Sequence, residues 1–158
     1  MSDVKIEKAD KTDAEDIAKI AYQVAKMHDE SVPEYFKPVS EKEQLQNIKE
    51  MLGDEKLFVF KAVCEGKICG FLFLEINYRE SDGLRFSRVG TVLNFGVDEA
   101  VRHQGIGEKL LKSAEDFCLK QGCKALDMSV FAFNQQAIQF YEKRGYKILD
   151  VSMRKVLK

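Results

Sequence analysis

The apolar residues change their spacing at Leu57, and this change most constrains the fold. Three strand-like runs follow, over residues 57–64, 68–78 and 88–97, separated by a short turn and the polar loop 79–87. Upstream and downstream of these runs, apolar residues recur every three or four positions, which is typical of amphipathic helices. The pattern therefore predicts an antiparallel meander flanked by helices.

The N-terminal region contains one short strand and two helix beginnings. Alternating apolar and polar residues predict a strand over Val4–Ala9. Thr12 with Glu15, and Ser40 with Glu43, have the spacing of capping boxes, in which each side chain bonds to the other residue's backbone N–H. We expect a helix to begin at each of these two pairs.

Helices and strands alternate after residue 97. The expected order is helix 107–121, strand 124–131, helix 135–144 and strand 146–157. A strand that follows a helical crossover runs parallel to the strand before it. The fold class is thus predicted as α/β (α+β mixed), with a mixed, largely antiparallel sheet, helices on both faces and a single domain over residues 1–158.

Composition narrows the class of protein. The 25 Lys and Arg residues nearly balance the 26 Asp and Glu residues, so the charge gives no signature of a nucleic-acid binder. No apolar run is long enough to span a membrane, and the N-terminus lacks the profile of a signal peptide. We therefore expect a cytoplasmic protein with no nucleic-acid and no membrane partner.

Four cysteines fall in two pairs, Cys64 with Cys69 and Cys118 with Cys123. The spacing within each pair is wider than in a zinc knuckle, and the chain has only two histidines, so we expect no metal site. Because all four lie in apolar segments of a chain without an export signal, we expect reduced and mostly buried thiols.

The stretch Arg102–Gly107, "RHQGIG", places two glycines where an amphipathic helix begins. Free backbone N–H groups and the positive end of the helix dipole stabilise an anion at such a position, and glycine lets a phosphate approach the backbone. The stretch lacks the Gly-Lys-Ser/Thr of a P-loop and the third glycine of a dinucleotide fingerprint. Taken alone, it leaves a phosphate cradle and a purely structural turn both open.

A second stretch, "NQQAIQFYEKRGYK", follows about thirty residues later. It places Asn134 at the start of a helix and Ala137 and Tyr141 on one face of it. Taken alone, Tyr141 is better explained as an ordinary core aromatic.

Together the two stretches resemble the GNAT superfamily of acetyl-CoA-dependent N-acetyltransferases. "VLNFGVDEAVRHQGIGEKLL" is similar to that family's Arg/Gln-x-x-Gly-x-Gly/Ala motif with its preceding strand, and "NQQAIQFYEKRGYK" is similar to its later motif. The resemblance covers the element order of nearly the whole chain and is sharpest from Thr91 to Tyr146. It implies a V-shaped splay between two parallel strands, with acetyl-CoA as cosubstrate and no metal.

The resemblance also implies the residues that bind the cosubstrate. The pyrophosphate would be held by backbone N–H groups of the glycine turn, and the pantetheine arm would lie in the splay. The implied contacts are Phe95, Gly96 and Val97 on the strand, Arg102, His103, Gln104, Gly105, Ile106, Gly107 and Glu108 in the turn, and Asn134, Ala137 and Tyr141 in the later helix.

The implied reaction is direct attack of a primary amine on the thioester. The Phe95 N–H would stabilise the oxygen on which charge develops. Tyr141 would donate a proton to the departing sulfur, since a phenol with an ordinary pKa of about 10 is protonated at neutral pH.

The general base is a separate question. Some relatives have a glutamate on the strand before the motif, where this chain has Thr91. If the two strands pair symmetrically about Gly83, Glu75 lies opposite Thr91 on the same face of the sheet. Glu75 is therefore a candidate base, while an exposed strand residue and deprotonation through water both remain open.

The acceptor is an amine on a small molecule or a protein. The resemblance places its pocket at the two early helices, at His28, Glu30, Tyr35 and Phe36, together with Arg79 and Arg85. Because dimers are common in the family, the resemblance makes a homodimer one possible oligomeric state. Two rival functions stay open: a non-catalytic acyl-CoA-binding or regulatory module, and a nucleotide-phosphate binder of another family.

Overall fold

The computed structural model describes residues 3–78 and 83–158. These residues form two compact units, one ending at Met128 and the other spanning Ser129–Lys158, and each is described separately. The expectation of a single domain stays a prediction.

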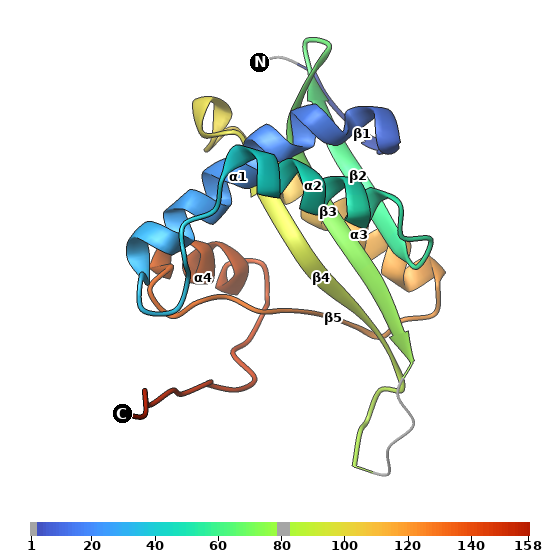
Figure 1. Ribbon diagram of the computed structural model, residues 1–158. Helices are drawn as coiled ribbons and strands as arrows, with labels where there is room; N and C mark the ends of the chain where they lie inside the picture. The colour runs from blue at the N-terminus through green and yellow to red at the C-terminus, as the bar shows by residue number, and fades with distance from the viewer. Residues whose placement is uncertain (1–2, 79–82) are drawn as a thin grey trace. The chain divides into compact units, whose positions relative to one another are not determined.

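The first unit is built on a five-stranded sheet in which neighbours in sequence are neighbours in space (Figure 1). Its strands are β1 (Val4–Lys8), β2 (Leu57–Cys64), β3 (Lys67–Tyr78), β4 (Arg88–Val97) and β5 (Ala125–Met128). The first four pair antiparallel, and β5 pairs parallel to β4. The predicted mixed, largely antiparallel sheet is confirmed.

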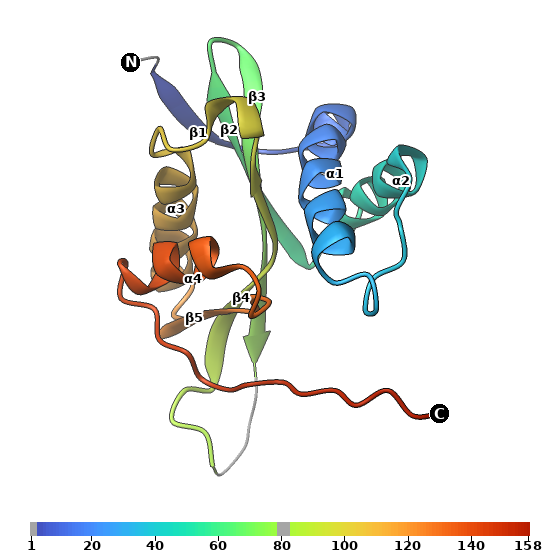
Figure 2. The same cartoon turned by 90° about the vertical axis from the view of Figure 1, so that its left-hand side faces the viewer.

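Helices cover both faces of this sheet, as predicted. Figure 2 shows α1 (Ala14–Ser31) and α2 (Glu41–Leu52) on one side and α3 (Ile106–Lys120) on the other. The side of α1 and α2 is held by a buried cluster that includes Ile17, Ile20, Ile48, Phe71 and Phe73. The helical spacing of apolar residues predicts a buried face of α3 at five residues. Ile106, Leu110, Leu111 and Ala114 are buried, and Phe117 is partly buried. Burial of these side chains removes apolar surface from water, which is the main force that holds such layers together.

One of the two predicted capping boxes is confirmed and the other is wrong. Ser40 and Glu43 bond to each other's backbone N–H groups at 3.1 and 3.0 Å. At the first helix the box is instead formed by Asp10 and Asp13, and Thr12 lies inside the short 3-10 turn Lys11–Asp13 that precedes α1. Asp10 has extended backbone and accepts the Thr12 N–H, so the chain turns two residues earlier than expected.

The parallel pairing of β4 and β5 is short. It joins Val89–Val92 of β4 to β5, while β4 itself continues to Val97. The described ladder thus ends five residues before β4 does, in agreement with the predicted splay. On its other side β4 contains a bulge, because Val92 and Asn94 pair with adjacent residues of β3 and Leu93 is the extra residue.

The cysteine prediction is wrong for one pair. Cys64 and Cys69 form a disulfide, with Cα atoms 6.1 Å apart. The hairpin between β2 and β3 brings the two residues within disulfide range, and Cys69 occupies a bulge in β3 opposite Ala62 and Val63. Cys118 and Cys123 are free and buried, as expected.

The second unit contains one helix, α4 (Gln135–Glu142), two residues shorter than predicted. The predicted strand over 146–157 is wrong, since this segment has neither helix nor strand (Figure 1). A strand requires a neighbouring strand for its backbone hydrogen bonds, which alternation of side chains alone does not supply.

Residues 3–78 and 83–158 contain neither a helix that could span a membrane nor a cluster of side chains suited to a metal ion. No helix there is long and apolar enough to cross a bilayer, and no group of three or more His, Cys, Asp or Glu side chains is arranged to hold a metal ion.

Candidate functional site

The glycine turn has an unusual backbone at the start of α3. Gly105 caps the helix with φ 79° and ψ 6°, and His103 has φ 64°. Positive φ is accessible to glycine at little cost, which explains Gly105 at this position. Gly105 has no side chain to cap the helix, so backbone N–H groups of the first turn are presented without a side-chain cap.

The space in front of Gly105 is open. A Cβ built on this residue would have no atom within 4 Å. Ile106, by contrast, is buried in the core, so only its backbone is available at the turn. Of the predicted contacts, Gln104 and Glu108 have exposed side chains and Gly107 is partly buried. The turn can therefore offer an anion a row of backbone donors and the positive end of the α3 dipole.

A hydrogen-bond network ties the approach to this turn to α1. The Gln23 side chain donates to Asp98 Oδ1 at 3.3 Å and accepts the Glu99 N–H at 3.0 Å. The Asp98 N–H donates to the carbonyl of Cys69 at 2.9 Å, so the same segment is also tied to β3. Sequence reasoning missed Gln23 and Asp98. The available signal was a glutamine between the apolar residues Ile20 and Val24 on α1.

The Arg102 side chain bonds back to the end of β4. Its Nε donates to the Val97 carbonyl oxygen at 3.1 Å. The acceptor of this bond is the backbone of Val97, one of the residues predicted to contact the cosubstrate. The bond thus ties the loop between β4 and α3 back to the last residue of β4.

Gly96 allows α1 to pack closely on β4. A Cβ at this position would lie 2.9 Å from Val24 Cγ2 and 3.0 Å from Phe71 Cε1. Gly96 therefore has a packing role whatever its relation to a ligand. Phe95 and Val97 flank it on the C-terminal half of β4, beyond the ladder with β5.

The predicted pairing of Glu75 with Thr91 is confirmed. The two residues are direct partners in the antiparallel ladder of β3 and β4, and thus share a face of the sheet. Asn77, which sequence reasoning missed, donates from Nδ2 to Thr91 Oγ1 at 2.8 Å. Its position two residues after Glu75 on the same strand was the signal that could have identified it. The pairing brings a carboxylate, a hydroxyl and an amide together, which suits proton transfer through a bound water.

In the second unit, Asn134 caps α4. Its Oδ1 accepts the N–H of Ala137 at 3.1 Å. This bond gives Asn134 a structural role as the cap of the helix. The predicted contacts of Asn134 and Ala137 with the cofactor stay predictions.

Tyr141 lies among aromatic side chains of the second unit. Its ring is 5.3 Å from that of Phe140 and 5.8 Å from that of Tyr146, centroid to centroid. Burial raises the pKa of Tyr141 to about 12, because the phenolate is disfavoured away from water. The hydroxyl is therefore a proton donor throughout the neutral range.

The predicted acceptor residues divide into two groups. The His28 ring packs edge-on against Phe36 at 5.5 Å between centroids, and Phe36 lies 4.7 Å from Tyr35. His28 Nδ1 is also 2.7 Å from the Val24 carbonyl oxygen. The three residues form an aromatic cluster at the end of α1.

Glu30 instead lines a groove along α1 and α2. The groove has a volume of about 800 Å³ and also includes Glu99 and Arg102 in its lining. Glu30 pairs with Lys26 across a 3.9 Å gap on the exposed face of α1. Arg85 is exposed in the loop before β4, and Arg79 lies outside the described residues.

Comparisons with known proteins cover both the glycine turn and α4. The model of the acetyltransferase (GNAT) family matches residues 24–146. YdgE, an uncharacterized N-acetyltransferase of Bacillus subtilis, is 30% identical over 93 residues, or 59% of this chain and 56% of YdgE. N-alpha-acetyltransferase 60 of Xenopus tropicalis is 33% identical over 112 residues, or 62% of this chain and 46% of that protein. The chain thus spans about half the length of these curated relatives.

Solved structures show the same fold. A mutant of the BH1408 protein from Bacillus halodurans superposes with a TM-score of 0.89 at 21% identity, covering 98% of this chain and 99% of the other. The aminoglycoside N-acetyltransferase AAC(6')-Iy in complex with CoA gives a TM-score of 0.77 at 17% identity, covering 100% and 97%. The family match includes both the glycine turn and α4, and we conclude that the chain belongs to the acetyltransferase (GNAT) family.

Proposed function

We propose that this protein transfers an acetyl group from acetyl-CoA to a primary amine by direct attack on the thioester. The observation that carries the proposal is the open, left-handed turn at Gly105, which begins α3 with backbone donors in a chain of this family. The structural neighbour AAC(6')-Iy was crystallised with CoA, which supports the choice of cosubstrate.

The residues at the turn fit a diphosphate. Such a ligand is a compact dianion, and successive N–H groups at a helix N-terminus match it in charge and in hydrogen bonding. The open side of Gly105 leaves room for it against the backbone. We assign this role to the backbone of residues 103–108, with Arg102 close by as a positive charge on the loop.

Acetyl-CoA supplies the thioester, and the chain supplies the groups that act on it. We assign the Phe95 N–H as donor to the carbonyl oxygen, because a placed donor lowers the barrier where negative charge develops. We assign the Tyr141 hydroxyl as donor to the leaving thiolate, because its raised pKa keeps it protonated at neutral pH.

Glu75 is the proposed base. Its carboxylate can accept the amine proton directly or through a water that the Thr91 hydroxyl helps to position. The Asn77 bond to Thr91 supports this arrangement, since it orients the hydroxyl on the face that Glu75 shares.

The acceptor is proposed to be a cationic amine on a small molecule or a protein. His28, Tyr35 and Phe36 would supply an aromatic wall, and Glu30 would supply a negative charge in the separate groove along α1 and α2. Among the similar proteins, one is an aminoglycoside acetyltransferase and another an N-alpha-acetyltransferase, so both small-molecule and protein amines belong in a substrate panel.

One observation favours a second candidate. Thr91 stands where some relatives carry a glutamate, which fits a module that binds acyl-CoA without turnover. A panel of aminoglycosides, polyamines, amino acids and peptides, with free CoA as readout, separates the two. Release of CoA that depends on one acceptor supports the enzyme, whereas binding of CoA without release for any acceptor supports the module.

The choice of ligand has its own test. Thermal stabilisation by CoA but not by ATP or NAD is expected, because the turn lacks the motifs of nucleotide-binding loops. Stabilisation by ATP or NAD alone would overturn the proposal.

A further inference from the structure

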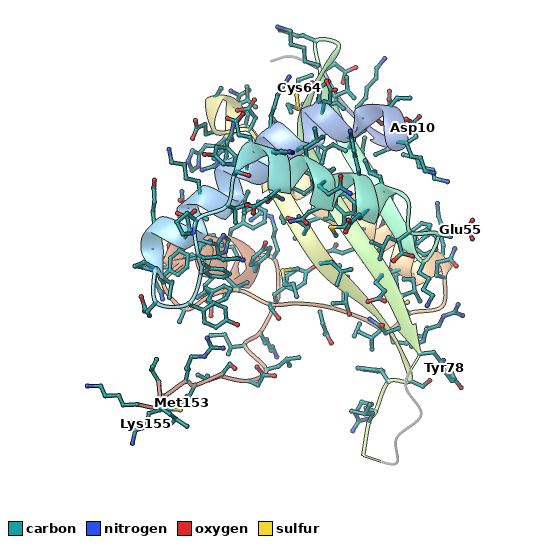
Figure 3. The ribbon with its side chains drawn as sticks, viewed as in Figure 1. Asp10, Glu55, Cys64, Tyr78, Met153 and Lys155 are labelled. Atoms are coloured by element: carbon teal, nitrogen blue, oxygen red, sulfur yellow. A yellow bond between two sulfur atoms is a disulfide. The ribbon has the colours of Figure 1, made fainter. Side chains whose placement is uncertain are left out.

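The disulfide between Cys64 and Cys69 lies at one end of the sheet of the first unit. Figure 3 labels Cys64 beside the hairpin that joins β2 to β3. The loop from β4 to α3 lies at the same end of the sheet in both ribbon views (Figure 1 and Figure 2). The disulfide and the glycine turn thus share one end of the sheet, although the proposed reaction gives the disulfide no role.

The two sulfurs of this disulfide differ in burial. Cys64 is partly buried, whereas Cys69 is only 4% exposed. Cys69 Sγ also lies 3.4 Å from the carbonyl oxygen of Ala62. In the dithiol form, the Cys69 S–H can donate to this oxygen, so the buried thiol has a hydrogen-bond acceptor in place. The fold therefore accommodates both forms of the pair, and Cys64 presents the sulfur that a dissolved thiol reaches more readily.

Cys69 is the extra residue of the bulge in β3. Ala62 pairs with Gly70 and Val63 pairs with Ile68, and Cys69 stands between these two pairs. The extra residue of a bulge is left out of the ladder, so its position depends on other bonds. The S–S bond is such a bond, because it ties Cys69 directly to β2.

The backbone at the bulge supports the entry to the glycine turn. The Cys69 carbonyl oxygen accepts the N–H of Asp98, the first residue after β4, at 2.9 Å. The next residue, Gly70, packs against the start of α3, where an added Cβ would lie 2.9 Å from Leu110 Cδ1 and 3.3 Å from Ile106 Cγ2. A shift of the bulge therefore reaches both the segment that enters the turn and the first turns of α3.

We propose that Cys64 and Cys69 form a thiol–disulfide exchange site whose redox state controls the backbone entering the glycine turn, and with it the affinity for acetyl-CoA. In the disulfide form, the bulge is tied to β2 and the Cys69 carbonyl is held as the acceptor for Asp98. In the dithiol form, the bulge gains freedom and the bond to Asp98 opens more often. The reactant at this site is a low-molecular-weight thiol together with its disulfide.

The exchange balances in atoms and electrons. A thiolate of the small molecule attacks Cys64 Sγ, the protein S–S bond breaks, and Cys69 leaves as a thiolate that takes up a proton. A second small thiolate attacks the outer sulfur of the mixed disulfide and releases Cys64, which also takes up a proton. Two small thiols thereby become one small disulfide, and the protein gains two electrons and two protons. Oxidation of the protein is the reverse reaction, with the small disulfide as oxidant.

The first test asks whether the pair exchanges in the folded protein. The full chain is equilibrated with reduced or with oxidised glutathione, quenched with acid, and labelled with N-ethylmaleimide under denaturing conditions. Peptide mapping by mass spectrometry is expected to find Cys64 and Cys69 labelled after reduced glutathione and protected after oxidised glutathione. Circular dichroism before the quench should be the same in both buffers. A pair that keeps one state in both buffers would overturn the proposal.

The second test measures the link to the glycine turn by hydrogen exchange. Reduction should accelerate exchange of the Asp98 amide about fivefold or more, because its acceptor on Cys69 is held less firmly. The Ala9 amide is the control, since it donates to the Val59 carbonyl oxygen at the same 2.9 Å, away from the hairpin. Its exchange should change less than about twofold. Equal acceleration of both amides would mean a general loosening of the sheet and would contradict control through the bulge.

A pair of variants separates the disulfide from the hairpin around it. Cys64→Ser removes the S–S bond and leaves the buried Cys69 in place, so its Asp98 amide should exchange at the rate of the reduced protein in both buffers. Lys67→Ser is the matched control, because Lys67 is exposed and pairs with Cys64 in the same hairpin. This control should keep the full response to glutathione. Cys69→Ala provides a second variant if Cys64→Ser fails to fold, and slow exchange of Asp98 in a folded variant without the disulfide would overturn the proposal.

The affinity for acetyl-CoA is a third readout, and it rests on the proposed function. Acetyl-CoA is used instead of CoA because its sulfur is acylated and does not exchange with the disulfide. Calorimetry after removal of glutathione is expected to show a dissociation constant about threefold or more higher for the reduced protein. Equal affinities of the two forms would overturn redox control. Binding by neither form would instead contradict the proposed function, and exchange of the Asp98 amide would still decide whether the pair controls the turn.

Discussion

Gln23 and Asp98 join α1 to the segment that enters the glycine turn. The Gln23 amide donates to Asp98 Oδ1, and its oxygen accepts the N–H of Glu99. Asp98 also accepts the N–H of Ala100 at 3.1 Å. A single side chain of α1 thus takes part in holding the two residues that follow β4.

Replacement of Gln23 by leucine should weaken CoA binding. The two bonds are each worth about 0.5–1.5 kcal/mol, or about 1–3 kcal/mol together, so we expect the dissociation constant for CoA to rise about 5- to 150-fold. Isothermal titration calorimetry measures it. Gln46→Leu, on the exposed side of α2, is the control and should leave binding unchanged. Equal affinities for both variants would contradict a positioning role for Gln23.

Two glycines with nearly the same backbone allow a matched test of the turn. Gly105 has φ 79° and Gly66 has φ 77°, and a Cβ on either would have no atom within 4 Å. Gly105→Glu and Gly66→Glu should therefore lose similar stability, about 1–2 kcal/mol in chemical denaturation. Only Gly105→Glu should abolish CoA binding, because it places bulk and negative charge in the phosphate position. If Gly105→Glu still binds CoA, the phosphate site does not lie at Gly105.

Tyr141→Phe should keep CoA binding and lower kcat by about 100-fold or more, since the departing thiolate loses its proton donor. Tyr78→Phe, at an exposed tyrosine, is the control. Steady-state kinetics and calorimetry together separate the two effects, and an unchanged kcat would exclude Tyr141 as the acid.

The raised pKa of Tyr141 also predicts a pH dependence of stability. In the folded chain the phenol ionises at about 12, above its ordinary 10.0, because burial disfavours the phenolate. Its contribution to the free energy of unfolding is therefore full below pH 10 and is lost as the pH rises from about 10 to about 12. Urea unfolding of the protein and of Tyr141→Phe across this range should show a steeper decline for the protein with Tyr141.

Glu75→Gln tests the proposed base. If Glu75 accepts the amine proton, kcat/KM of the variant should fall by about 100-fold or more at neutral pH. Glu55→Gln, at an exposed turn before β2, should behave as the unmodified protein. A kcat/KM of Glu75→Gln equal to that of the control would assign proton removal to water.

The sheet could be predicted where side-chain pattern and hairpin symmetry agree. The partnership of Glu75 with Thr91 followed from pairing about Gly83, and the structure has it. Both register shifts escaped prediction, because the extra residues, Cys69 and Leu93, are apolar residues inside apolar segments and do not stand out in the sequence. The disulfide escaped for a related reason, since it depends on a bulge that places Cys69 near Cys64.

Of the two predicted helix beginnings, one was right and one was wrong. Ser40 had no competing cap and the prediction was right, whereas Asp10, Thr12 and Asp13 all have side chains that can accept a backbone N–H. The glycine turn itself could be located from sequence, but the network of Gln23 and Asp98 joins residues 75 positions apart and has no local signature.

The bulge at Leu93 alters how β4 should be mutagenised. Thr91 pairs with Glu75 and Asn94 pairs with Phe73, which are two residues apart on β3 and thus share a face. Thr91 and Asn94 therefore face the same side although they are three positions apart. A substitution library that assigns odd and even residues of β4 to opposite sides would be right up to Val92 and inverted from Asn94 onward.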